Sequence, residues 1–367
     1  MSASLPRLWK HIQRSAQMEP SYMSVARLMR ETRSDAKSVL HTARWLHEQL
    51  PIRFAQRIEE FLQLPHVVIC NPHINSTLNR YLETYEVITD FPDILTSRDE
   101  MAFAKLVNEQ LVLHDSCTTF LAEGYREVRQ CYPQIQLDAF LNDLFTVRIA
   151  CRILMENYIA MREPVDRCIG VVRQGMRPLS LVQSMATRLT DLASSHYGNA
   201  PELEFRGNPD CVLDYIPRHV GYMVRELLKN AIRATIERHQ QNLFNLPPVV
   251  VELQQGDIHV IIKISDHGGG MPKRVQHEAW QYGWTTAGVD SPQQIAGYGF
   301  GLPLSRLHAQ YFGGDLFMQA LPGHGTDMYL LLTHLKQGSS ATEMEDPTTV
   351  VYQKRRSMPP ASPVCDR

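Results

Sequence analysis

The stretch Glu226–Thr235, which reads ELLKNAIRAT, decides the fold of the second half of this 367-residue chain. A helix turns about 100° per residue, so Glu226 shares an arc of about 100° with Lys229, Asn230, Arg233 and Glu237. Most other positions nearby are apolar, which predicts a buried helix with one polar stripe. That stripe faces either solvent or a ligand. If it faces a ligand, the carboxylate can take a proton and the amide oxygen can bind Mg²⁺.

Two glycine-rich segments follow this helix. Ile262–Pro272 (IKISDHGGGMP) ends a predicted strand with Asp266, an acid that can accept a hydrogen bond from an exocyclic amine such as that of adenine. Gly297–Arg306 (GYGFGLPLSR) leads into a predicted helix, where alternating glycines can present N–H groups to phosphate oxygens. Taken alone, each segment could be an ordinary glycine turn. Neither has the Rossmann or Walker A spacing.

Apolar periodicity predicts a change of architecture along the chain. In the first half it indicates helices separated by prolines, arranged as an antiparallel bundle: Ser38–Gln49, Arg53–Leu62, Ser76–Ile88, Glu100–Gln130 and Gln136–Met161. In the second half it predicts helices at Ser180–Ser195 and His219–Gln240, with strands at Glu202–Arg206, Val249–Leu253, Ile258–Ser265, Asp315–Leu321 and Asp327–Leu335. The fold class is therefore α+β.

This pattern predicts four segments: a basic N-terminus (1–19), a helical domain (20–179), an α+β domain (180–336) and a flexible polar tail (337–367). The N-terminal segment has three basic residues and no acid before Glu19, so it is either a transit peptide or a plain basic terminus. Seven scattered cysteines without a CxxC pair indicate free thiols. A net charge of −2 and the lack of a long apolar run argue against nucleic acid and membrane insertion.

The three motifs in order, a helical ExxxN, DxGGG and GxGxGLP, resemble the GHKL ATP-binding fold. Further segments resemble the mitochondrial 2-oxoacid dehydrogenase kinases over roughly residues 20–335: Leu50–Arg53, Cys70–Pro72, Thr89–Pro92, Leu121–Gly124, Tyr197–Pro201 and Gly325–Asp327. The resemblance implies an N-terminal helical bundle followed by a GHKL-type α/β sandwich. It also implies a protein serine kinase that uses ATP and Mg²⁺.

Two features place the resemblance nearer to the branched-chain 2-oxoacid dehydrogenase kinase than to the pyruvate-type kinases. Tyr222 stands where pyruvate-type kinases usually have a histidine, and no Asp-Trp dipeptide occurs in the tail. The implied function is phosphorylation and inactivation of the E1 component of the branched-chain complex in the mitochondrial matrix. The implied partners are the lipoyl-bearing E2 core and a second copy of the chain.

The resemblance also implies roles for individual residues. Glu226 corresponds to the general base and Asn230 to the Mg²⁺ ligand, while Lys229 and Arg233 would neutralise phosphate charge. The remaining nucleotide-site positions are Asp266, Gly268, Gly270, Thr285 and Thr286 on the adenine side, and Gly297, Tyr298, Gly299, Phe300, Gly301 and Leu302 on the phosphate side. His114, Arg148 and Arg152 resemble the residues that bind 2-oxoacid inhibitors.

The sequence departs from the family pattern at two places, and it leaves rival functions open. Gln281 replaces an acid near the family's potassium site, so dependence on K⁺ is uncertain, and the predicted lid between Thr286 and Gly297 is short. The rival substrate is the pyruvate dehydrogenase E1. Two rival functions are a protein-histidine kinase with His47 as acceptor, and a nucleotide-binding scaffold without transferase activity.

Overall fold

The computed structural model describes residues 5–285, 297–335, 347–349 and 351. It divides into two compact units, Met1–Val165 together with Glu345–Arg367, and Asp166–Met344. The division falls earlier than the boundary predicted at residue 179. The physical reason is a short sheet: β1 (Cys168–Ile169) pairs with β2 (Val172–Met176), and β2 pairs with β4 (Leu213–Tyr215) of the second unit.

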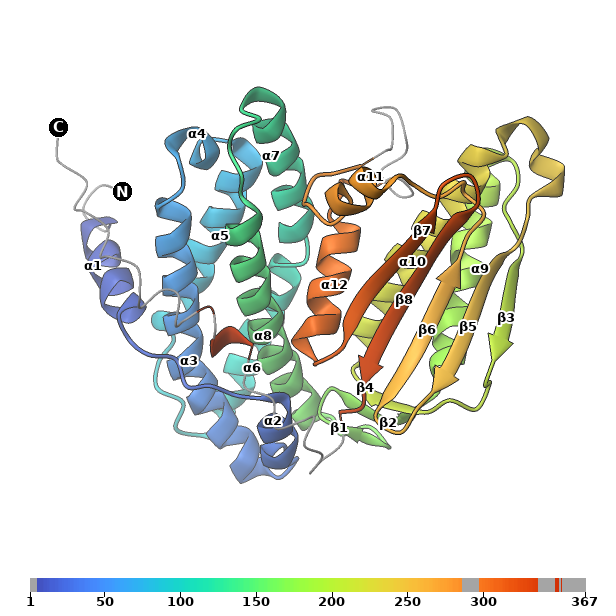
Figure 1. The fold of residues 1–367 in the computed structure, drawn as a ribbon. Helices are drawn as coiled ribbons and strands as arrows, with labels where there is room; N and C mark the ends of the chain where they lie inside the picture. Colours follow the sequence, from blue (N-terminus) through green and yellow to red (C-terminus); the bar gives the residue numbers. More distant parts are fainter. Residues whose placement is uncertain (1–4, 286–296, 336–346, 350, 352–367) are drawn as a thin grey trace. The chain divides into compact units, whose positions relative to one another are not determined.

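The first unit is the predicted helical bundle (Figure 1). Its central helix α3 packs against α1, α5, α6 and α8 around buried side chains such as Leu46, Phe61 and Tyr85. The helices are α1 (Leu5–Ala16), α2 (Val25–Glu31), α3 (Ala36–Leu62), α4 (His66–Ile69), α5 (Pro72–Thr89), α6 (Ser97–Leu113), α7 (Cys117–Cys131) and α8 (Asp138–Arg162).

One prediction for this bundle is wrong at Pro51, which lies inside α3 and does not separate two helices. A proline inside a helix costs about 3 kcal/mol because it removes a backbone hydrogen bond. Leu50, Ile52 and Phe54 are nearly fully buried around it. Burying each such side chain contributes roughly 1.5–3 kcal/mol, so packing outweighs the local cost.

The predicted helix Glu100–Gln130 is also wrong, because the structure breaks it into α6 and α7 at His114–Ser116. Two guanidinium groups satisfy the carbonyls that the break exposes. Arg80 Nη1 donates to Leu113 O at 2.7 Å, and Arg148 Nη2 donates to His114 O. Cations at a helix C-terminus bind its last carbonyls and interact favourably with its dipole.

Part of the basic N-terminal segment folds onto this bundle. Ile12 on α1 is buried, and Ser15 Oγ lies 2.9 Å from the hydroxyl of Tyr85 on α5. Gln56 Nε2 donates to Met18 O at 2.9 Å. These contacts hold α1 against α5 and the residues just after α1 against α3.

The second unit has a five-stranded sheet with helices along one face (Figure 1). Its strands run in the order β3 (Leu203–Gly207), β5 (Val249–Gln255), β6 (His259–Ser265), β8 (Gly325–Thr333) and β7 (Asp315–Leu321); β3 and β5 are parallel and the other pairs antiparallel. The helices are α9 (Pro178–Tyr197), α10 (Pro217–Arg238) and α12 (Gly301–Tyr311), with α11 (Lys273–Glu278) and a 3₁₀ turn (Gln240–Asn245) besides. Val249, Val251 and Leu253 alternate into the core beneath α10. The predicted α+β class and its main strands are confirmed.

In the part of the chain that the structure describes, no helix is both long and apolar enough to span a bilayer.

Candidate active site

An open pocket of about 1450 Å³ lies in the second unit between α10, the end of β6 and the start of α12. All five members of the predicted polar stripe line it: Glu226, Lys229, Asn230, Arg233 and Glu237. The opposite face of α10 is buried, with Val220, Val224 and Leu228 fully enclosed. The stripe therefore faces a ligand-sized pocket, as the helical spacing allowed.

Glu226 lies at one end of this pocket with its carboxylate held at both oxygens. Lys229 Nζ is 2.6 Å from Oε2, and Arg225 Nη2 is 3.3 Å from Oε1. Gly301, in the first turn of α12, approaches so closely that a Cβ there would lie 2.4 Å from Glu226 Oε2. A side chain at 301 would therefore displace the Glu226 carboxylate from the start of the helix.

The start of α12 is suited to an anionic group. Gly299, Gly301 and Leu302 line the pocket, and the N-cap residue Phe300 makes no side-chain hydrogen bond to the first turn. The N-terminal N–H groups of a helix and its dipole favour phosphate. Gly297 lies beside Lys229, because a Cβ at 297 would be 3.2 Å from Lys229 Nζ. An ammonium group thus adjoins this end of the pocket.

Asp266, at the end of β6, lies at the other side of the pocket. Its Oδ1 accepts hydrogen bonds from the backbone N–H groups of Gly268 (2.8 Å) and Thr326 (3.2 Å). These bonds fix the carboxyl orientation, so Oδ2 can accept a bond from a ligand. Burial raises the pKa of Asp266 to about 6, despite both backbone bonds.

The structure brings together most of the predicted nucleotide-site residues. Besides those already described, Gly268, Gly270 and Thr285 line the pocket. Phe300 is absent from the lining: its ring is buried 4.9 Å from that of Tyr282, where it supports the loop from the core side. Tyr298 and Gln281 are also absent from the lining. Thr286 and most of the predicted lid lie outside the described residues.

Some lining residues were not predicted as site residues. The clearest is Thr326, whose backbone N–H orients Asp266 and whose carbonyl accepts from the Asp266 N–H at 3.0 Å. The Gly325–Asp327 segment, which carries part of the family resemblance, is the sequence signal for this residue. The others are mainly apolar: Met271, Val275, Ala279, Trp284, Met318 and Met328. Apolar side chains of this kind suit an aromatic base.

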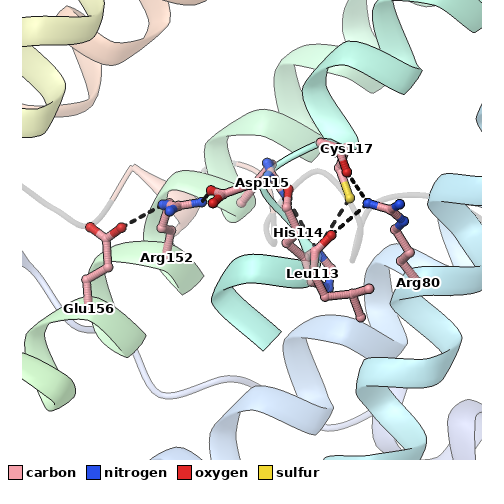
Figure 2. A network of polar contacts seen from close by, with 9 residues as sticks. Arg80, Leu113, His114, Asp115, Cys117, Arg152 and Glu156 are labelled. Atoms are coloured by element: carbon pink, nitrogen blue, oxygen red, sulfur yellow. Dashed lines mark hydrogen bonds and ion pairs between the residues drawn. The ribbon is translucent and has the colours of Figure 1, made fainter. Parts of the chain in front are cut away.

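A second cavity, smaller than the pocket in the second unit, lies within the helical unit. It brings together the predicted His114, Arg148 and Arg152. Arg152 lies between two acids, with Nη1 2.8 Å from Asp115 Oδ1 and Nε 2.7 Å from Glu156 Oε1 (Figure 2). The full lining is Arg53, Phe54, Arg57, Tyr81, Leu111, His114, Val147, Arg148, Cys151, Arg152 and Met155.

His114 in this cavity is a neutral imidazole. Burial, reinforced by Arg148, Arg80 and Arg152, lowers its pKa to about 3. Arg148 Nη1 lies 3.3 Å from Nδ1, and because a guanidinium can only donate, Nδ1 is the acceptor. Nε2 then carries the proton and donates to Thr84 Oγ1 at 2.8 Å, which in turn donates to Gln110. This chain fixes the ring beside the arginines.

His47, the rival phosphoacceptor, is held within the helical unit. Its Nε2 lies 3.1 Å from Ile88 O, and its ring packs edge-on against Phe91 and Phe103. These contacts give the imidazole a structural role.

The fold and the pocket together define a GHKL-type ATP-binding domain. Residues 216–336 match the family model described as "Histidine kinase-, DNA gyrase B-, and HSP90-like ATPase". Residues 22–173 match the model "Mitochondrial branched-chain alpha-ketoacid dehydrogenase kinase". The two matches cover the helical unit and the ATP-binding domain in the expected order.

The similarity to curated relatives extends over both the helical unit and the ATP-binding domain. The chain is 32% identical over 315 residues to a mitochondrial pyruvate dehydrogenase (acetyl-transferring) kinase of Arabidopsis thaliana, covering 82% of this chain and 86% of the relative. It is 33% identical to the Schizosaccharomyces pombe kinase of that name (73% and 68% covered) and 30% identical to isozyme 1 of Homo sapiens (80% and 73%). The chain belongs to the mitochondrial 2-oxoacid dehydrogenase kinase family, whose members are protein kinases that use ATP with Mg²⁺.

The residues present fit this nucleotide. A Cβ at Gly301 or Gly297 would fill the space beside Glu226 and Lys229, so these glycines keep the phosphate side open. Oδ2 of Asp266 can serve as an acceptor at the base side. Within the described residues no group of three or more His, Cys, Asp or Glu side chains could hold a metal. The Asn230 amide oxygen suits Mg²⁺, which usually shares phosphate oxygens and waters.

Proposed function

We propose that this protein phosphorylates a serine of the E1 component of a mitochondrial 2-oxoacid dehydrogenase complex and thereby inactivates that complex. The observation that carries the proposal is the juxtaposition of Glu226 with the first turn of α12. A carboxylate beside a phosphate-binding helix terminus can orient an incoming hydroxyl and take its proton. A scaffold that only binds nucleotide has no need for this carboxylate.

Four of the five polar residues of the stripe have a role in this proposal. Bound Mg·ATP supplies the phosphoryl group and the metal that neutralises its charge. Asn230 would hold the metal, Asp266 would accept from the adenine amine, and the start of α12 would bind phosphate. Lys229 lies between the phosphate loop and Glu226, so it neutralises phosphate charge and orients the carboxylate. Arg233 adds positive charge along the same wall.

The proposed acceptor is the pyruvate dehydrogenase E1. The three relatives described above are named pyruvate dehydrogenase kinases, and their similarity extends over most of this chain. The branched-chain preference predicted from Tyr222 is not confirmed. Tyr222 is partly buried on α10 and packs against His308 at 5.0 Å and beneath Arg225 at 5.4 Å, so the tyrosine itself supports the base-bearing helix.

The deciding experiment is transfer of labelled γ-phosphate from ATP to purified pyruvate E1 and, separately, to branched-chain E1. Each is tested with its own E2 core. Label on a serine of pyruvate E1 supports the proposal, whereas label on branched-chain E1 alone changes the substrate. Acid-labile label on the kinase at His47 would indicate a histidine kinase. ATP binding without any transfer would indicate a scaffold.

Asn230→Ala should weaken binding of Mg·ATP while leaving binding of ATP without metal nearly unchanged. The physical reason is that the substitution removes the oxygen proposed to hold the metal. We expect the gain in affinity on adding Mg²⁺ to fall by about tenfold or more, the loss of one good interaction. Titration calorimetry with and without Mg²⁺ measures it, with Asn79→Ala on the exposed side of α5 as control. An unchanged gain would remove Asn230 as the metal ligand.

We further propose that the cavity of His114, Arg148 and Arg152 binds a 2-oxoacid inhibitor. The carboxylate would bind Arg148, whose hydrogen-bond partners His114 Nδ1, His114 O and the Tyr81 hydroxyl are uncharged. Arg148→Lys keeps the charge but loses the planar fork, so affinity for pyruvate should fall about tenfold. Calorimetry on the full chain measures this, with Arg44→Lys outside the cavity as control. Equal pyruvate affinity in both variants would place the inhibitor elsewhere.

The remaining proposals concern partners and location. We propose docking on the lipoyl-bearing E2 core, a homodimer and residence in the mitochondrial matrix; the relatives are named mitochondrial kinases. Phe317 on the edge strand β7 is exposed beside Tyr329, which gives the sheet an apolar area for a second copy. Sedimentation equilibrium of the full chain tests the dimer. Co-sedimentation with E2 tests the docking.

A further inference from the structure

The cavity in the helical unit has arginines from two helices. Arg148 and Arg152 come from α8, where the sequence predicted them. Arg53 and Arg57 come from α3, and the inhibitor assignment makes no use of them. A monocarboxylate bound at Arg148 needs no cation from α3. The second pair therefore calls for its own explanation.

Arg53 and Arg57 differ in how their donors are used. Arg53 donates through Nη1 to Gln49 and through Nη2 to Ser21 O, so it holds the chain that precedes α3. Arg57 is 1% exposed, and its Nη2 lies 2.5 Å from Glu60 Oε1. In the described part of the chain, its Nε and Nη1 are buried without a hydrogen-bond partner. Leaving charged donors buried and unpaired is costly, so their presence at a cavity indicates an anionic ligand group.

Arginines therefore line the cavity from both α8 and α3, and the two sides are called here its α8 end and its α3 end. At the α8 end, Arg148 has neutral acceptors at His114, while Arg152 is already paired with Asp115 and Glu156 (Figure 2). At the α3 end, Arg57 has unused donors. Apolar side chains complete the lining, mainly Phe54, Leu111, Val147 and Met155. A short molecule with an anionic group at each end and methylenes between them matches this distribution.

We propose that this cavity prefers a small 2-oxo dicarboxylate, with one carboxylate bound by Arg148 and the other by Arg57. The 2-oxoacid part of the inference rests on the inhibitor pocket proposed above. The second carboxylate of the ligand is inferred from the unpaired donors of Arg57. A monoacid can bind at the α8 end, but it leaves the donors of Arg57 unpaired.

Calorimetry on the full-length protein tests the preference without any E1 substrate. The probes are 2-oxoglutarate and 2-oxohexanoate, a diacid and a monoacid of similar length. The wild type should bind the diacid more tightly by about tenfold to a hundredfold, the range for a charge-assisted pair. Arg57→Met should bring the two affinities together by weakening diacid binding alone. Arg27→Met, which removes an exposed arginine of α2, is the matched control and should keep the preference.

A structural role for Arg57 predicts different results. Arg57→Lys keeps a positive charge and should retain part of the diacid preference. Uniform weakening of both ligands in Arg57→Met, without rescue by Arg57→Lys, would overturn the inference. Equal binding of the two acids by the wild type would overturn it as well, while leaving the monoacid pocket intact. If neither acid binds, the inhibitor pocket itself is wrong; the phosphotransfer proposal is tested separately with E1.

Discussion

Glu226→Gln should bind Mg·ATP about as tightly as the wild type but transfer phosphate to E1 about a hundredfold to ten-thousandfold more slowly, the usual range for a lost general base. The amide has the same shape as the carboxylate and its oxygen can still accept from Lys229 Nζ. The amide cannot take the serine proton. In this one variant the affinity for Mg·ATP should therefore be kept while the rate of phosphoryl transfer falls.

Single-turnover transfer and calorimetric ATP titration give the two measurements. Glu204→Gln is the control, since Glu204 is an exposed residue on β3 paired with Arg206 and lies outside the pocket lining. Transfer at the wild-type rate by Glu226→Gln would remove Glu226 as the base. Equal loss of binding and transfer would mean that the carboxylate shapes the pocket and does not act on the acceptor.

The parts of the site that could be predicted from sequence are those fixed by local periodicity. The i, i+3, i+4 spacing from Glu226 places the polar stripe on one face of α10 whatever the helix packs against. The strands predicted at Val249–Leu253 and Ile258–Ser265 likewise correspond to β5 and β6. Asp266 could be predicted because a strand that ends in an acid and glycines puts that acid at the sheet edge.

The parts that could not be predicted depend on contacts between distant residues. The break between α6 and α7 is stabilised by Arg80 and Arg148, which lie on other helices, so no local signal marks it. The strands β1, β2 and β4 are short and are defined by pairing with one another. Phe300 sits between two pocket-lining glycines, and only tertiary packing shows that its ring faces Tyr282.

Asp266→Asn should lower the affinity for ATP by about a hundredfold and at the same time stabilise the protein without nucleotide. Affinity falls because a carboxylate acceptor for the adenine amine is replaced by an amide that can present its own donor. A hydrogen bond to a charged group contributes about 1.5–3 kcal/mol, which sets this magnitude. Stability rises because the buried carboxylate is destabilising in its ionised form.

The expected gain in stability follows from the pKa of Asp266, which burial raises from 3.8 to about 6. Between these values the folded state binds more protons than the unfolded state, so the stability contributed by this group falls as pH rises from about 4 to 6. Above pH 6 the full cost is present, about 1–3 kcal/mol once partial solvent screening is allowed for. Asparagine removes this cost, so the melting temperature at pH 7.5 should rise.

The pH dependence of ATP binding distinguishes the loss of a charged acceptor from a change in the shape of the pocket. In the wild type, affinity should fall as pH drops through about 6, because protonation of Asp266 removes the charged acceptor. The asparagine variant should lack that titration and bind weakly throughout. Calorimetry from pH 5 to 8 measures both proteins, with Asp257→Asn in the β5–β6 turn as control. If Asp266→Asn melts at a lower temperature than the wild type, Asp266 is needed mainly for its bonds to Gly268 and Thr326, and its buried charge is not the dominant effect.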